Sequence, residues 1–222
     1  MMNVKSMTYK TTTDLVVVGA GGLGREVVWL IREINAVKKT WSFIGLADDG
    51  MQGKTVEGYP IVGTVSDIIN QPARPHFVVA IADSQIRRQI TQELLVQHFP
   101  LATLVHPQVN QSNNQIGEGS IVCAGTILTT NVNLGRSCIV NPGCFIGHDA
   151  VIQDYVSLMP GAHIAGETTV GTGCFLGIGS TVKNRVKLGD NGTYGAGAVV
   201  INHMPDDIVA VGVPAKVIKN KQ

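Results

Sequence analysis

The chain has 222 residues, a length that suits one large domain or two small ones. Its 17 basic and 16 acidic side chains nearly balance, so no electrostatic case exists for binding nucleic acid or an anionic membrane. The apolar runs are too short for a membrane span and residues 1–14 hold no signal-peptide core, so we expect a cytoplasmic protein without membrane insertion.

The N-terminal region begins with a strand, a glycine-rich loop and a helix. Residues 15–18 are an apolar, mostly β-branched run, which predicts a buried strand. Gly19, Gly21 and Gly24 follow in the order G-x-G-x-x-G, and residues 25–34 have the apolar spacing of a helix. Such a turn lets backbone N–H groups approach a phosphate at the positive end of a helix. The sequence therefore predicts a nucleotide-binding loop here.

The rest of this region predicts a small α/β domain. Residues 42–47 form a second strand that ends at Asp48 and Asp49, at about the distance where an acid meets a ribose or a base edge. A helix over 85–99 follows Ser84, a residue type that caps helices. The remaining predicted elements are strands over 59–62, 77–82 and 101–105 and a helix over 65–70. We therefore expect a Rossmann-like domain over residues 1–107, followed by a polar joint at 108–115.

The glycine loop does not by itself identify a ligand. G-x-G-x-x-G would suggest a nicotinamide dinucleotide, but a full dinucleotide fold needs two nucleotide-binding halves and this region has room for one. A different nucleotide, a nicotinamide cofactor and a loop without ligand all stay open from these residues alone.

The second half of the chain repeats every six residues. Fifteen lead positions hold an aliphatic residue in all cases but one, which is Tyr194: Ile116, Val122, Leu128, Leu134, Val140, Ile146, Ile152, Leu158, Ile164, Val170, Leu176, Val182, Leu188, Tyr194 and Val200. A mostly small residue follows four positions after each lead, and glycine often follows directly. A sixfold repeat of this length is typical of a parallel β-helix, in which stacked coils bury a column of branched side chains.

The repeat also sets the dimensions of this domain. Three hexads make one triangular coil, so fifteen hexads make five coils, and at about 4.8 Å per strand the prism is roughly 24 Å tall. A β-sandwich would instead show period two with turns of varied length. We expect the β-helix domain, with a C-terminal tail, over residues 108–222. Periodicity alone does not give its handedness.

The four cysteines show no spacing typical of a metal site. Cys138, Cys144 and Cys174 occupy the small inward position of their hexads, which predicts a packing role. Cys138 and Cys174 share a column two coils apart, about 9.6 Å by strand spacing, too far for a disulfide. A catalytic thiol is the alternative.

Three segments resemble the NeuD/PglD family of hexapeptide acyltransferases: 146–155 (IGHDAVIQDY), 160–166 (PGAHIAG) and 212–216 (GVPAK). Similarity extends over nearly the whole chain. The resemblance implies a left-handed β-helix, a homotrimer, acetyl-CoA as co-substrate and no metal. It further implies N-acetylation of a UDP- or dTDP-linked 4-amino sugar for a surface glycan, or O-acetylation of a sialic acid or related sugar.

The resemblance also assigns the nucleotide-sugar site. It implies contacts from the glycine loop, the two acids and the end of the 77–82 strand, that is, from Gly19, Gly21, Gly22, Gly24, Asp48, Asp49, Ala80, Ile81 and Ala82. Leu23 stands where relatives often carry histidine, and Ala82-Asp83 replaces a common Gly-Asn pair. The resemblance therefore does not assign contacts to the nucleotide base at these positions.

The His148-Asp149 dipeptide matches the catalytic pair of the family. Histidine suits proton transfer near neutral pH, and a carboxylate on its other nitrogen fixes the tautomer. The resemblance makes His148 the general base and Asp149 its supporting acid. Acetyl-CoA would lie between β-helices and contact Ser157, Gly166, Ile178, Ala196, Pro214 and Lys216, although relatives often carry histidine in place of Ser157.

Other readings remain open. Alone, the dipeptide also fits a solvated corner histidine, and we expect His163 and His203 to be surface residues. Some left-handed β-helix trimers are zinc enzymes with three histidines at each site, but no comparable histidine spacing occurs here. A scaffold that binds sugar nucleotides without catalysis is the last alternative.

Overall fold

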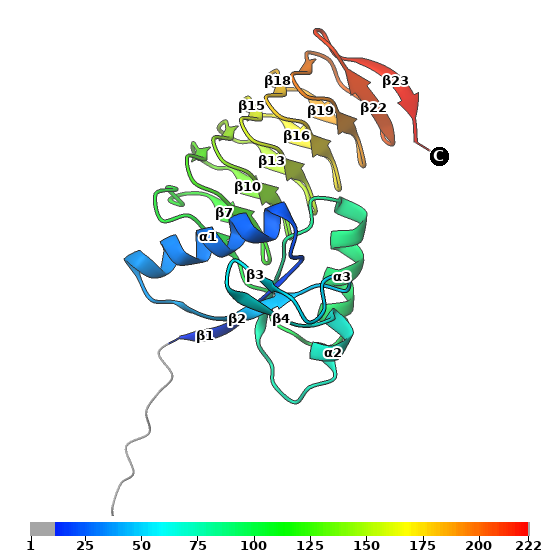
Figure 1. The fold of residues 1–222 in the computed structure, drawn as a ribbon. Helices are drawn as coiled ribbons and strands as arrows, with labels where there is room; N and C mark the ends of the chain where they lie inside the picture. The colour runs from blue at the N-terminus through cyan, green and yellow to red at the C-terminus, as the bar shows by residue number, and fades with distance from the viewer. Residues whose placement is uncertain (1–11, 222) are drawn as a thin grey trace, which may run out of the picture.

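The computed structural model describes residues 12–221, which form an N-terminal α/β domain and a tall β-helix that rises from it (Figure 1). Residues 1–11, most of the segment in which no signal-peptide core is expected, lie outside the described range. Within the range, no helix has the length and apolar composition needed to cross a bilayer.

The N-terminal domain is a five-stranded sheet with helices on both faces. Its elements in chain order are β1 (Thr13–Val18), α1 (Gly22–Val37), β2 (Trp41–Ala47), β3 (Thr55–Val56), β4 (Tyr59–Gly63), α2 (Val65–Ile69), β5 (His76–Val79) and α3 (Ser84–Val96). The strand order is β3-β4-β2-β1-β5, and all neighbours are parallel except β3 and β4. Apart from the short β3, each of these elements was expected from the sequence.

Burial on both faces explains the apolar run of β1. Leu15 and Val17 pack with α1, whereas Val16 and Val18 pack in a second cluster with residues of α2 and α3. All four are at most 2% exposed. A strand covered on both sides loses the alternation of an ordinary sheet and becomes continuously apolar.

One expected helix cap is wrong. Asp83, not Ser84, caps α3, and its carboxylate accepts hydrogen bonds from the Gln85 and Ile86 N–H groups. Ser84 instead donates its hydroxyl to the Gly173 carbonyl of the β-helix. Aspartate caps as well as serine, so local sequence could not separate the two.

The expected strand over 101–105 is divided between the two domains. Leu101 pairs with Phe77 of β5, whereas β6 (Leu104–Val105) pairs with β8 (Ile121–Val122) of the β-helix. We therefore place the domain boundary between Leu101 and Leu104, a few residues before the expected joint.

The β-helix follows the predicted hexads. Its strands are β7 (Gln115–Ile116), β8, β9 (Ile127–Leu128), β10 (Asn133–Leu134), β11 (Ile139–Val140), β12 (Phe145–Ile146), β13 (Val151–Ile152), β14 (Ser157–Leu158), β15 (His163–Ile164), β16 (Thr169–Val170), β17 (Phe175–Leu176), β18 (Thr181–Val182), β19 (Lys187–Leu188), β20 (Thr193–Tyr194) and β21 (Val199–Val200). Each strand pairs in parallel with its counterpart one coil away, as Ile152 does with Leu134 and Val170. The lead residues from Val122 to Val200 are at most 4% exposed and form one core cluster. The predicted register is therefore confirmed.

The prism has three faces. The β7 face consists of β7, β10, β13, β16 and β19, and the β9 face consists of β9, β12, β15, β18 and β21. The third, which we call the covered face, begins at β6 and ends in a hairpin of β22 (Ile208–Val211) and β23 (Lys216–Asn220). Ile121, Cys123 and Ile139 at its lower end pack in the core cluster of β1 and α1. The N-terminal domain therefore sits on this face.

Two corners of the prism flank the β9 face. The His148 corner joins the β9 face to the β7 face and comprises residues 129–132, 147–150, 165–168, 183–186 and 201–204. The Ile178 corner joins the covered face to the β9 face and comprises residues 123–126, 141–144, 159–162, 177–180 and 195–198. The His148 corner thus lies opposite the covered face.

Candidate active site

His148 and Asp149 form a hydrogen-bonded pair at the exposed His148 corner. Nδ1 of His148 lies 2.8 Å from Oδ2 of Asp149, and both side chains are about half exposed (56% and 51%). An ionised carboxylate only accepts hydrogen bonds, so Nδ1 donates and Nε2 of the neutral ring is left as an acceptor. The pair has the arrangement expected for a general base and its supporting acid.

Asp149 is itself held in place. Its Oδ1 accepts a hydrogen bond from Nδ2 of Asn131, one coil below, at 3.2 Å. Hydrogen bonds from His148 and then Asn131 lower the pKa of Asp149 below its usual value. The carboxylate is therefore ionised at neutral pH and able to orient the imidazole.

Gly166 leaves room for the imidazole. A Cβ atom at this position would lie 2.6 Å from Nε2 of His148, so the acceptor nitrogen sits directly over the glycine. The flanking Ala165 and Glu167 N–H groups have backbone acceptors, whereas no hydrogen bond from the Gly166 N–H occurs among the described residues. The equivalent N–H groups of this corner on neighbouring coils likewise make no backbone hydrogen bond among the described residues, but that of Gly166 lies beside the histidine ring.

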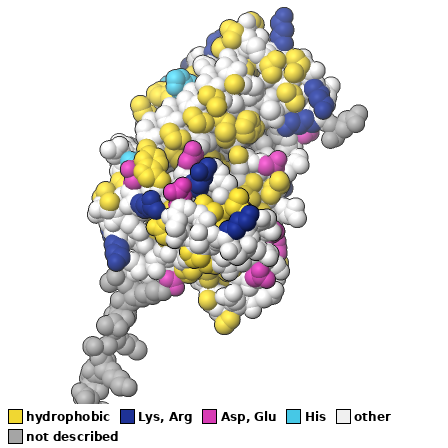
Figure 2. All heavy atoms as spheres, in the orientation of Figure 1, with side chains coloured by type: hydrophobic (Ala, Val, Ile, Leu, Met, Phe, Trp, Pro, Cys, Tyr) yellow, Lys and Arg dark blue, Asp and Glu magenta, His cyan; other side chains and the backbone are white. Residues whose placement is uncertain are grey.

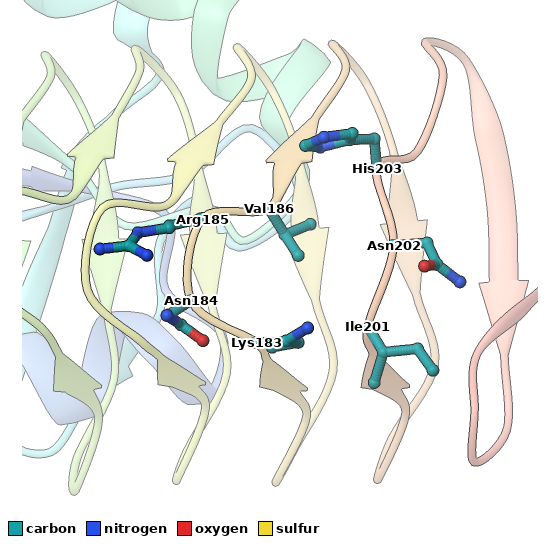
Figure 3. A pocket seen from close by; sticks show the side chains of 7 residues that line it. All are labelled: Lys183, Asn184, Arg185, Val186, Ile201, Asn202 and His203. Carbon is teal, nitrogen blue, oxygen red and sulfur yellow. The ribbon is translucent and has the colours of Figure 1, made fainter.

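Further up the same corner lies a basic hollow of about 550 Å³ between the fourth and fifth coils (Figure 3). Lys183 and Arg185 lie on one coil and His203 on the next, together with Asn184, Val186, Ile201 and Asn202. Arg185 pairs with Glu167 at 2.9 Å, which lowers the pKa of that carboxyl. The sequence analysis did not predict this hollow, although all seven residues occupy corner positions of hexads that stack on consecutive coils.

The N-terminal domain contains a separate cavity of about 230 Å³ at the carboxyl ends of its strands. Gly19, Asp48, Asp49 and Ile81 line it together with Val18, Ala47, Gly50, Val65, Ile86 and Ile90. This edge of a parallel sheet is where α/β folds bind ligands. The structure thus brings together the loop glycine, the two acids and part of the third segment that the sequence assigned to the nucleotide sugar.

The glycines of the loop serve different purposes. Gly19 has a φ of +97°, and a Cβ there would lie 2.9 Å from the Ala80 carbonyl oxygen. A Cβ on Gly24 would collide with the Gly19 carbonyl oxygen, so Gly24 lets α1 approach the loop. Only Gly21 and Gly22 face open space. The pair at the start of α1 is therefore the part of the loop that a ligand can approach.

Two other groups that were expected to contact the nucleotide sugar already accept hydrogen bonds within the protein. The Asp48 carboxylate accepts hydrogen bonds from the Ala20 and Gly50 N–H groups, both at 2.9 Å, so it also braces the glycine loop. The carbonyl of Ala82 accepts bonds from Arg87 and Ser157. Asp49, in contrast, is exposed.

The expected acetyl-CoA contacts divide between different parts of the prism. Gly166 belongs to the His148 corner, and the exposed Ile178 and Ala196 belong to the Ile178 corner. Pro214 and Lys216 are exposed in the C-terminal hairpin, at the far end of the prism from the N-terminal domain (Figure 1).

Ser157 differs from expectation. It is fully buried on the covered face and donates its hydroxyl to the Ala82 carbonyl at 2.8 Å, so it does not open onto a corner. The reason is its hexad position: it points outward, but onto the face that the N-terminal domain covers.

The cysteines lack the features of a nucleophile. All four are free and buried, and burial raises the pKa of Cys144 to about 11 and those of Cys123, Cys138 and Cys174 to about 12. Reactive cysteines need an accessible thiolate. Nor do the described residues bring three His, Cys, Asp or Glu side chains together as a metal site would require.

The β9 face is unusually apolar for an uncovered surface. Ile127 is 56% exposed on this face, and Ile178 and Ile201 are 61% and 42% exposed at the two corners that adjoin it. On the side of the β-helix that Figure 2 shows, hydrophobic side chains are also frequent and charged ones few between the N-terminal domain and the C-terminal hairpin. Exposed apolar surface of this kind marks an interaction site.

Sequence comparison identifies relatives of both domains. Residues 14–94 match the PglD N-terminal domain. A GDP-perosamine N-acetyltransferase of Escherichia coli O157:H7 is 29% identical over 196 residues, which cover 87% of this chain and 80% of that protein.

Solved structures give the same result. The acetyltransferase domain of PglB from Neisseria gonorrhoeae FA1090, in complex with acetyl coenzyme A, superposes with a TM-score of 0.85 at 32% identity, covering 93% of this chain and 100% of that one. A perosamine N-acetyltransferase mutant from Caulobacter crescentus, in complex with CoA and GDP-perosamine, gives a TM-score of 0.85 at 29% identity, covering 93% and 97%. The fold class expected from the sequence, a Rossmann-like domain followed by a left-handed β-helix, is thus confirmed.

Proposed function

This chain belongs to the NeuD/PglD family of sugar acetyltransferases, and on that premise we propose that it transfers an acetyl group from acetyl-CoA to the amine of a nucleotide-linked sugar. The observation that carries the proposal is the His148-Asp149 pair, whose Nε2 is open at an exposed corner beside an unengaged N–H group. Relatives named for GDP-perosamine make GDP-linked amino sugars the first acceptors to test, beside the UDP- and dTDP-linked 4-amino sugars that the sequence suggests.

His148 supplies the base in this scheme. The neutral acceptor amine attacks the thioester carbon while Nε2 of His148 takes a proton from the nitrogen. Negative charge that develops on the former carbonyl oxygen is stabilised by the Gly166 N–H. The carbon–sulfur bond then breaks, and the imidazolium, stabilised by Asp149, returns the proton to the CoA thiolate. The products are an N-acetyl sugar nucleotide and CoA, and no acyl-enzyme forms.

We infer that this site is completed by a second copy of the chain. Within one chain the nucleotide cavity belongs to the domain on the covered face, whereas His148 lies at the opposite corner. If the apolar β9 faces meet around a threefold axis, the His148 corner of each copy abuts the Ile178 corner of the next. That corner borders the neighbour's covered face, which carries the N-terminal domain with the nucleotide cavity. A closed ring satisfies the same contact in every copy, which supports a homotrimer.

The same arrangement suggests a course for acetyl-CoA. The donor would lie between the two corners, with its thioester at His148 and Gly166 and its pantetheine arm beside Ile178 and Ala196 of the neighbour. Its phosphates would reach towards the basic hollow at Lys183 and Arg185, and the tail with Pro214 and Lys216 lies at the same end of the prism. The hollow is two to three coils above His148, about 10–14 Å at ordinary strand spacing.

A screen with matched variants tests the function. Purified protein is mixed with acetyl-CoA and GDP-, UDP- or dTDP-linked amino sugars, and free CoA is measured. His148→Ala should lower turnover by roughly 10²–10⁴, the usual effect of removing a general base, while acetyl-CoA still binds. Cys144→Ala should retain turnover. CoA release with free sialic acids and not with any sugar nucleotide would favour the O-acetyltransferase reading, and no release with any acceptor would favour a scaffold.

A further inference from the structure

Arg87 is the largest fully buried side chain of the described residues, and its charge is held by carbonyl groups. Its Nε donates to the Ser137 carbonyl at 2.8 Å and its Nη2 to the Tyr155 carbonyl at 2.5 Å. Its Nη1 donates to the carbonyls of Ile81 and Ala82 at 2.6 and 3.0 Å. None of the ion pairs among residues 12–221 involves Arg87.

Two of these four bonds cross to the β-helix, and the other two hold the segment that follows β5. Ser137 and Tyr155 belong to consecutive coils of the β-helix, at the corner between the β7 face and the covered face. Ile81 and Ala82 follow β5, and the Ile81 side chain lines the nucleotide cavity. One guanidinium therefore fixes the end of the cavity wall against the neighbouring domain.

The helix that carries Arg87 reinforces this connection. On one side of α3, Ile86 and Ile90 line the cavity. On the other, Arg87 and Thr91 are buried against the β-helix, and the Thr91 hydroxyl lies 3.5 Å from that of Ser137. The helix thus touches the ligand cavity and the β-helix with adjacent residues.

Two serines hold the same segment. Ser157 donates its hydroxyl to the Ala82 carbonyl at 2.8 Å, and Ser84 donates to the Gly173 carbonyl at 2.9 Å. Residues 81–84 are thereby attached to the second, third and fourth coils. A segment that only connects β5 to α3 does not need so many bonds to another domain.

We propose that Arg87, assisted by Ser157, is a positioning residue that sets the nucleotide-sugar cavity in register with the β-helix, and hence with the catalytic corner of the neighbouring copy. A buried guanidinium without a carboxylate partner adds little net stability, because its desolvation offsets its hydrogen bonds. Its fork geometry, in contrast, fixes direction, since all its donors lie in one plane. The proposal rests on the proposed function, because it assigns a sugar nucleotide to the cavity.

The test separates positioning from stability. Arg87→Lys keeps the charge and loses the planar fork. We expect the KM for the sugar nucleotide to rise by roughly tenfold or more, since small misplacements of bound groups have large kinetic costs. The KM for acetyl-CoA should stay within about twofold, because the basic hollow and the His148 corner are untouched. Ser157→Ala removes one bond to the same segment and should raise the sugar-nucleotide KM by roughly two- to tenfold, the range for one hydrogen bond.

Arg88→Met is the matched control. Arg88 is the next residue of α3, is exposed and lies over the Tyr155 ring, so its loss should leave both KM values unchanged. If Arg87→Lys and Ser157→Ala lower the melting temperature but change neither KM, Arg87 is only structural and the proposal is overturned.

Hydrogen exchange gives a readout that does not need the substrate. Arg87→Lys should speed amide exchange in residues 81–86, and Arg88→Met should not. If wild-type protein releases no CoA with any sugar nucleotide but the exchange difference is found, the attachment stands and the assigned function fails. Unchanged exchange in Arg87→Lys would overturn the attachment itself.

Discussion

The absence of a side chain at Gly166 decides where the imidazole of His148 can lie. Alanine there needs no unusual backbone angle, but its Cβ would overlap Nε2 of His148. We expect Gly166→Ala to fold normally and to lower kcat by about 10²-fold, the order expected when a catalytic group is displaced by about 1 Å. Steady-state kinetics together with a melting curve check this.

A double-mutant comparison controls the result. If Gly166 acts through His148, adding Gly166→Ala to His148→Ala should cause almost no further loss, because coupled residues are not additive. Losses that multiply would show that Gly166 acts independently, for instance through its N–H group alone.

Tyr194 interrupts the aliphatic column and is matched by its neighbour. Its ring is fully buried, its hydroxyl has no hydrogen-bond partner among the described residues, and a Cβ on Gly192 would lie 2.7 Å from that hydroxyl. Gly192 is the one glycine among the small inward positions of the hexads. The glycine therefore supplies the volume that the tyrosine needs.

Stability measurements can test this pairing. Tyr194→Phe removes a buried, unpaired hydroxyl, so it should stabilise the protein by about 1 kcal/mol, or about 2–4 °C in melting temperature. Gly192→Ala should destabilise the protein, because the new Cβ would overlap the tyrosine hydroxyl. Adding Tyr194→Leu to Gly192→Ala should restore the lost stability. A large destabilisation by Tyr194→Phe would mean that the hydroxyl has a partner.

At the scale of the element, one strand can test the hexad register. Ile152 and Val151 are neighbours in β13, but Ile152 is 1% exposed in the core and Val151 is 38% exposed on the β7 face. Ile152→Asp buries an unpaired carboxylate and should cost several kcal/mol, whereas Val151→Asp should cost less than about 1 kcal/mol. Thermal unfolding of the two variants side by side measures the difference. Similar losses from both would contradict the register.

The hexads could be predicted because each one repeats the same local requirement: an aliphatic residue and a small residue inward. The connection between the N-terminal domain and the β-helix could not be predicted in the same way. The sequence predicts that Leu104 and Val105 continue the strand that begins at Leu101. They belong to the β-helix because they pair with Ile121 and Val122. Pairing between residues distant in sequence leaves no local signal.

The candidate site also combines a local feature that could be predicted with long-range contacts that could not. The His148-Asp149 pair is a sequence neighbour pair, so its hydrogen bond could be predicted. Arg87 and Ser157 gain their importance from carbonyl groups 50 to 75 residues away, and backbone acceptors carry no side-chain signature. From the sequence alone, an arginine in an amphipathic helix is expected on the solvent-exposed side, so the burial of Arg87 could not be predicted.

For the whole molecule, subunit mixing can test whether two copies share a site. His148→Ala removes the base, and Ile81→Trp should fill the nucleotide cavity, so each variant alone should be inactive. Co-expressed at equal levels, about a quarter of the interfaces would combine an intact corner with an intact cavity. We therefore expect about a quarter of wild-type turnover per subunit. No recovery in verified mixed oligomers would place the whole site within one chain.

Because the coils stack regularly, equivalent residues along the His148 corner are evenly spaced. Hydrogen-bonded neighbours along it are 18 residues apart, as Asn131 and Asp149 are, and each step adds about 4.8 Å. Removing residues 165–182 would keep every later hexad in frame, yet bring the basic hollow one step closer to the imidazole. It would also place Asn184 where Gly166 now lies. The number of coils between His148 and the basic hollow therefore sets the length of donor that the prism can accept. That length can change only by whole coils.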